Sequence, residues 1–161
     1  MGRAILLVAL LLLAVPPLAA QEWTAEQQEV VEWLNTFNDV AYAGSADEFM
    51  DWLHPEFTDW NYSEKAPHEM ESFAEVVTEF FAGVESIQLR TKPISVHVSG
   101  DVAVVHTWFR EAITGGVAEG NYGGRWTIVL KKVDGDWKHL AWTWTQEDAK
   151  REKMEKPKDE G

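Results

Sequence analysis

The chain has 161 residues, with 27 acidic and 14 basic side chains, a net charge of −13 and no cysteine. The lack of cysteine excludes a disulfide framework, a thiolate nucleophile and any cysteine-ligated metal centre. The negative charge argues against nucleic acid or an anionic membrane as partner, because both require a cationic surface. The length suits one domain that buries its own core.

The first 20 residues have the order of a secretory signal peptide. Arg3 precedes an unbroken apolar run over residues 4–15, and Ala19 and Ala20 supply small residues before polarity returns. This run is shorter than the roughly 20 residues that a membrane-spanning helix needs. We therefore expect cleavage near Ala20, a secreted or periplasmic protein, and no stable membrane anchor after cleavage.

The first half of the predicted domain, residues 21–146, has the apolar period of helices. Thr24 and Gln27 form a capping box at the start of the first helix, and Ser45 begins a second box. Pro55 is expected to end the short second helix. The predicted helices cover residues 24–44, 45–54 and 68–82, and residues 56–67 are expected to form a loop with a short strand at 57–60.

From Ile87 onward the apolar period changes from 3.6 to 2, which indicates strands. Pro93 marks a bulge or an edge position, and Asp134-Gly135 predicts a hairpin turn. Residues 115–124 contain five glycines and predict a flexible connection. The predicted strands cover residues 87–98, 102–112, 125–133 and 137–145, and the charged residues 147–161 predict a disordered tail.

This order of elements predicts an α+β fold rather than alternating βαβ units. Three N-terminal helices should lie in the concave face of a strongly curved, mainly antiparallel sheet, because long antiparallel strands twist and coil. Bulky residues occupy both faces of the strand at residues 102–111. One face should cover the helices, and we expect a homodimer to form through the other.

Three segments together carry a family resemblance. They are the stretch FMDWLHPEFTDW at residues 49–60, SGDVAVV at 99–105 and WTIVLKKVDGDW at 126–137. In this order they resemble the SnoaL-like branch of the nuclear-transport-factor-2-like superfamily. The resemblance implies a cystatin-like cone with a pocket between sheet and helices, usually dimeric. It does not imply one activity, because the superfamily includes isomerases, cyclases, dehydratases, ligand binders and assembly domains.

Asp59 is the candidate catalytic residue. The resemblance places the catalytic positions of ketosteroid isomerases on Phe37, which cannot donate a hydrogen bond, on Trp60, and near Thr127 or Val129, which are not acids. Steroid isomerisation is therefore not expected. Asp59 lies one residue from the position of the base, which on a regular strand means the opposite face. A bulge would turn Asp59 inward, where it could act as a general base. The alternative is an exposed acid at a strand end.

Two further polar residues are weaker candidates. His106 could act with Asp59 as an acid–base pair, and Arg125 could hold an acidic group of a ligand through its guanidinium. The alternative for both is a solvent-facing position on the sheet. The sequence contains no HExxH motif and no tight cluster of metal-binding residues, so we expect neither a metal nor a cofactor.

The nine tryptophans are the strongest indication of function. Ligand pockets are mostly apolar, so aromatic residues that share the inner face predict a site for a small apolar or aromatic molecule. Simple core packing, a lyase or isomerase that uses Asp59, and an assembly domain with a vestigial pocket remain alternatives. The predicted ligand-binding residues are Phe37, Trp60, Tyr62, Trp108, Trp126, Trp142, Trp144 and Arg125.

Overall fold

The computed structural model describes residues 22–40, 42–43 and 45–147. The predicted signal peptide at residues 1–20 lies outside the described residues, as does the predicted tail beyond Glu147. Within the described residues, no helix has both the length and the apolar character needed to cross a bilayer.

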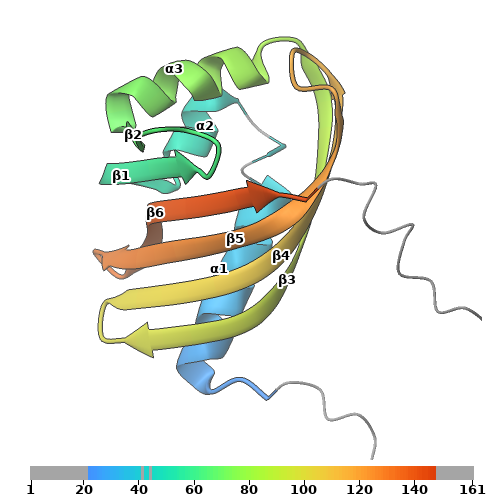
Figure 1. The fold of residues 1–161 in the computed structure, drawn as a ribbon. Coiled ribbons are helices and arrows are strands. Elements are labelled where there is room, and N and C mark those ends of the chain that lie inside the picture. Colours follow the sequence, from blue (N-terminus) through green and yellow to red (C-terminus); the bar gives the residue numbers. More distant parts are fainter. Residues whose placement is uncertain (1–21, 41, 44, 148–161) are drawn as a thin grey trace, which may run out of the picture.

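Helix α1 (Ala25–Val40) begins at the predicted capping box. The Thr24 amide donates to Gln27 Oε1 at 2.9 Å, and the Gln27 amide donates to Thr24 Oγ1 at 3.3 Å. Val30, Leu34 and Phe37 form the buried stripe, which lies against the concave face of the sheet (Figure 1). Burial of this stripe, rather than helix propensity alone, holds α1 in place.

The other two helices also begin or end at the predicted signals. In α2 (Ala46–Met50), the Ser45 amide donates to Glu48 Oε2 at 2.7 Å, and the Glu48 amide donates to Ser45 Oγ at 3.3 Å. Helix α3 (Met70–Phe81) buries Phe73 and Val77. It is followed by Gly83, whose φ of 77° lies in the left-handed region that glycine adopts without steric cost.

All six strands belong to one sheet with the order β2-β1-β6-β5-β4-β3. Strand β1 runs parallel to β6, and the other neighbours are antiparallel. The sheet curves strongly, so that β3, β4 and β5 rise toward one end of α3 (Figure 1). The predicted α+β class and the curved, mainly antiparallel sheet are thus confirmed. The strands are β1 (Leu53–Asn61), β2 (His68–Glu69), β3 (Val84–Ser99), β4 (Val102–Gly115), β5 (Gly120–Val133) and β6 (Asp136–Gln146).

Several predicted boundaries are wrong, since residues 68–69 of the predicted third helix form β2 and the second helix ends at Met50. Strand β1 begins at Leu53 and includes Pro55, which lies where the pairing with β6 is interrupted between Leu53 and Thr58. Proline is accepted there because no ladder hydrogen bond needs its missing N–H. Strand β5 begins at Gly120, so only residues 116–119 connect it to β4, because the glycines at 120–124 pair with β4.

Candidate functional site

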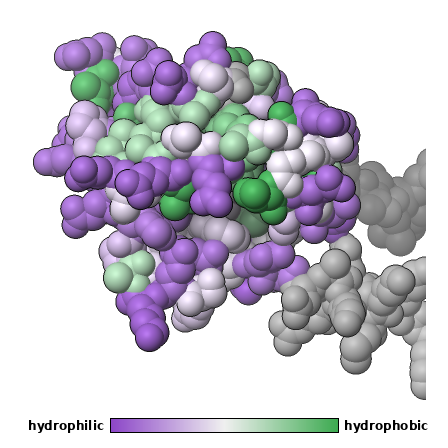
Figure 2. Space-filling view, turned by 90° about the horizontal axis from the view of Figure 1, so that it is seen from above, coloured by the Kyte–Doolittle hydropathy of each residue, from purple (hydrophilic) through white to green (hydrophobic). Residues whose placement is uncertain are grey.

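A cavity of about 310 Å³ lies between α3, the concave face of the sheet and the β4–β5 connection. Figure 2 looks down on this end of the molecule and shows apolar surface gathered inside a hydrophilic rim. The cavity is lined by Tyr42, Phe49, Asp59, Phe73, Val76, Val77, Phe80, Phe81, Phe109, Glu111, Ile113, Ala118, Tyr122, Trp126, Trp142, Trp144 and Gln146. Its wall is therefore mainly aromatic, as is typical of small-molecule sites.

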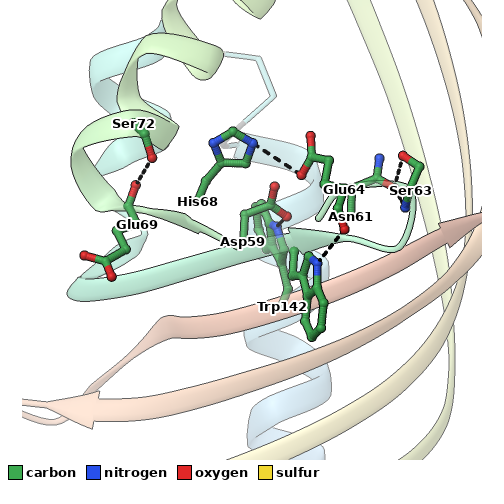
Figure 3. A network of polar contacts seen from close by, with 9 residues as sticks. Asp59, Asn61, Ser63, Glu64, His68, Glu69, Ser72 and Trp142 are labelled. Atoms are coloured by element: carbon green, nitrogen blue, oxygen red, sulfur yellow. Dashed lines mark hydrogen bonds and ion pairs between the residues drawn. The ribbon is translucent and has the colours of Figure 1, made fainter. Parts of the chain in front are cut away.

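Asp59 faces this cavity and is buried. Asp59 has the same parity along β1 as buried Leu53 and Phe57, so the regular alternation of the strand turns it to the inner face. The Trp142 indole N–H donates a hydrogen bond to Asp59 Oδ1, and Figure 3 shows this contact between β1 and β6. Burial raises the pKa of Asp59, and the hydrogen bond from Trp142 offsets part of that rise.

A polar contact between His68 and Glu64 flanks Asp59 on the side of β2. His68 Nε2 lies 3.3 Å from Glu64 Oε2, and His68 is the register partner of Asp59 (Figure 3). After burial and the Trp142 hydrogen bond, the negative charge of Glu64 raises the pKa of Asp59 and His68 lowers it by a smaller effect. The protonation state of Asp59 is thus coupled to groups outside the cavity.

Glu111 provides a second carboxyl group in the cavity wall, although it is not among the predicted catalytic or ligand-binding residues. It lies on β4, and burial raises its pKa to about 7. Within the described part of the chain it has no hydrogen-bond or ion-pair partner. The detectable signal was its position in the alternation of β4, which puts one acid on the same face as buried Phe109 and Ile113.

Tyr42, which follows α1, brings a hydroxyl group to the same cavity. Burial raises the pKa of Tyr42 well above its usual value, and the charges of Glu111 and Asp59 raise it further. Both carboxyl groups are therefore close enough to act on this hydroxyl. Two acids and a phenol within an apolar wall could hold a cation, donate hydrogen bonds when protonated, or transfer protons.

Three of the predicted tryptophans line the cavity: Trp126, Trp142 and Trp144. The rings of Trp126 and Trp142 are nearly parallel with centroids 6.0 Å apart, and Phe109 stacks on Trp126 at 4.5 Å. Phe37 does not line the cavity. It is completely buried in the core beneath the cavity, with its ring centroid 6.5 Å from that of Trp142.

Trp60 and Tyr62 do not line the cavity, and this part of the prediction is wrong. Trp60 is 48% exposed, and its indole donates to the Glu64 carbonyl at 3.2 Å. Tyr62 is 81% exposed. Asp59 points inward, so its neighbour Trp60 points outward, because successive side chains of a strand point to opposite faces.

Trp108, Arg125 and His106 lie on the convex face of the sheet, so they cannot contact a molecule in the cavity. The Arg125 guanidinium lies 5.4 Å from the centre of the Trp108 ring, and its Nε lies 3.4 Å from Glu147 Oε1. His106 Nδ1 lies 3.0 Å from Thr127 Oγ1. The predicted pairing of His106 with Asp59 is therefore wrong, because inward Thr107 fixes the opposite orientation for His106.

No group of three or more histidine, aspartate or glutamate side chains in residues 22–40, 42–43 and 45–147 is placed to hold a metal ion.

A strongly curved sheet closed by helices over an aromatic cavity defines an α+β cone. The chain belongs to the SnoaL-like domain family, whose model it matches over residues 30–143. No match is found among curated proteins.

Solved structures of distant sequence share the fold. A conserved protein from Planctomyces limnophilus is 10% identical to this chain, with a TM-score of 0.65. The matched region covers 76% of this chain and 97% of that protein. A protein from Novosphingobium aromaticivorans, provisionally named a scytalone dehydratase, is 12% identical with a TM-score of 0.65. The matched region covers 76% of this chain and 85% of that protein. A Nostoc punctiforme domain of unknown function with a cystatin-like fold is 14% identical with a TM-score of 0.59, covering 81% and 83%. At these identities the likeness establishes the fold alone.

Proposed function

We propose that this SnoaL-like domain binds a small apolar or aromatic molecule in its cavity. The observation that carries the proposal is the cavity of about 310 Å³ walled by the stacked rings of Phe109, Trp126 and Trp142. Ligand sites have volumes of about 300–1,000 Å³, mostly apolar walls and a few convergent polar groups. Asp59, Glu111 and Tyr42 supply such groups here.

Naphthalene-based probes should change the tryptophan fluorescence of the protein on binding, because three indoles line the cavity. The variant Val77→Phe adds a ring to a buried position of the wall and should weaken binding at least tenfold. Ile94→Phe, at a 45% exposed position outside the cavity, is the matched control and should bind like the unmodified protein. A broad probe panel without any response, in protein shown to be folded, would contradict the proposal.

A lyase or isomerase that uses Asp59 as general base is the second candidate. The buried carboxylate with a raised pKa favours it, as does the provisional name of the Novosphingobium protein. Asp59→Asn should lower any turnover by at least 100-fold, within the usual contribution of about 10²–10⁴ from a positioned base. Retained binding of the probes would show that the cavity is intact, whereas unchanged turnover would exclude Asp59 as the base.

We also propose that the protein is exported and forms a homodimer through the convex face of the sheet. Residues 1–20 have the order of a signal peptide, and the convex face presents paired Val104 and Val129 together with 40% exposed Trp108. Light scattering and intact mass of the exported protein should give a dimer of chains that begin near Gln21. A monomer at micromolar concentration, or chains that retain Met1, would contradict the corresponding part.

A further inference from the structure

We propose that the molecule held in the cavity is a small arylalkylamine, in which an alkyl group carries the amine, bound as its ammonium cation next to Glu111 and Asp59. This inference rests on the proposed function and specifies the ligand class for the same cavity.

The first argument is the sign of charge in the cavity wall. In the part of the chain that the structure describes, the charged side chains that line the cavity are the carboxyl groups of Asp59 and Glu111, and no lysine, arginine or histidine is among the lining residues. Both carboxyl groups lie close enough to Tyr42 to affect its hydroxyl. A cation would therefore meet complementary charge, whereas a carboxylate ligand would meet like charge in a poorly solvated site.

The second argument is that Glu111 is an acceptor that the wall leaves without a donor, while two donors of the wall are already used. The Trp142 indole donates to Asp59, and the Tyr122 hydroxyl donates to the Ala118 carbonyl at 2.9 Å. Glu111 instead has no donor among the described residues. An ammonium group supplies donors and no acceptor, so it matches the acceptor that the wall leaves unsatisfied.

The third argument is the orientation of the aromatic rings. Phe109, Trp126 and Trp142 stack on one another along the sheet, with centroid separations of 4.5 and 6.0 Å. Aromatic faces attract cations, most strongly when the cation is removed from water. The aromatic wall would also pack against the aromatic part of the ligand, and the net charge of −13 would favour the approach of a cation.

Proton release gives the proposal a specific signature. Burial raises the pKa of Glu111 to about 7, so at pH 7 the empty cavity holds this acid about half protonated. An ammonium group beside it stabilises the ionised form and lowers that pKa. Binding should therefore release up to about half a proton per site at pH 7, and a neutral ligand should release none.

The experiment compares three probes that share one ring system: 1-naphthylmethylamine, 1-naphthylmethanol and 1-naphthoate. Isothermal titration at pH 7 in buffers of different ionisation enthalpy measures affinity and proton release together. We expect the amine to bind at least tenfold more tightly than the alcohol, with proton release, and the carboxylate to bind most weakly. Glu111→Gln should abolish the release and remove most of the preference for the amine, while alcohol binding persists. Glu79→Gln, an exposed acid on α3 outside the cavity wall, is the matched charge control and should behave like the unmodified protein.

Each outcome separates this inference from the proposed function. Equal affinity for amine and alcohol, or tighter binding of the carboxylate, would overturn the amine assignment while the apolar site stands. No binding of any probe would overturn both. A preference for the amine that survives in Glu111→Gln and in Asp59→Asn would overturn the role of these two carboxyl groups.

Discussion

Replacing Gly124 with alanine should destabilise the domain by about 3 kcal/mol or more, at the upper end of the cost of overpacking a core. A Cβ atom at Gly124 would lie 1.9 Å from the Thr145 carbonyl oxygen and 3.0 Å from the Phe109 ring. The nearest atom belongs to the backbone of β6, so rotation of a side chain cannot relieve the contact. Strands β5 and β6 would have to separate beside Trp126 and Trp144, a register pair that lines the cavity.

Gly123→Ala is the matched control, one residue away on the same strand. Its Cβ would meet the Phe109 carbonyl oxygen at 3.6 Å, an ordinary van der Waals distance. This variant should be neutral or more stable by up to about 1 kcal/mol, because alanine has fewer unfolded conformations than glycine. Urea unfolding followed by circular dichroism compares the two variants. Equal stabilities would show that β5 and β6 accommodate a side chain at Gly124.

The sequence alone was sufficient for the order of the elements, because the signals involved are local. The boxes at Thr24 and Ser45 require only residues three positions apart, and both form. The Asp134-Gly135 turn has positive φ at both residues, 53° and 97°, as a two-residue hairpin turn requires. Pro93 likewise marks the irregularity in the pairing of β3 with β4.

The face that each side chain occupies was harder to predict than the order of the elements. Trp126, Trp142 and Trp144 line the cavity, but the sequence did not decide which face of the sheet is the inner one. In β1 the buried positions are Leu53, Phe57 and Asp59, so regular alternation puts Asp59 inward and Trp60 outward. The expectation that Trp60 faces inward came from the family resemblance, and the alternation of the strand overrides it. The glycines of β5 were misread as a flexible connection because their pairing with β4, and the close approach of Gly124 to Thr145 of β6, depend on residues distant in sequence.

The buried histidine of β6 shows another non-local effect. His139 is completely buried. The centroid of its ring lies 4.5 Å from that of Phe37, 4.8 Å from that of Trp142 and 4.9 Å from that of Trp33. Neither of its ring nitrogens has a hydrogen-bond partner among the described residues. Burial lowers the pKa of His139 to about 3 from 6.5. The folded protein therefore holds a neutral imidazole in conditions where the unfolded chain would protonate it.

Replacing His139 with leucine should make the protein markedly more resistant to acid. Between pH 6.5 and pH 3 the unfolded chain binds a proton at His139 that the folded protein does not, so this residue lowers the free energy of unfolding as pH falls. The loss is about 1.4 kcal/mol per pH unit. The stability gained by His139→Leu should therefore be about 3 kcal/mol larger at pH 4.5 than at pH 7.5.

The difference in free energy of unfolding between His139→Leu and the unmodified protein separates the effect of His139 from that of the two acids of the cavity. Glu111 and Asp59 have raised pKa values, so their contributions change in the opposite direction and strengthen the fold as pH falls. These contributions are common to both proteins and cancel in the difference. His97→Leu, which removes an exposed histidine of β3, is the matched control. A stability difference for His139→Leu that does not change between pH 7.5 and pH 4.5 would show that the buried imidazole is protonated in the folded protein.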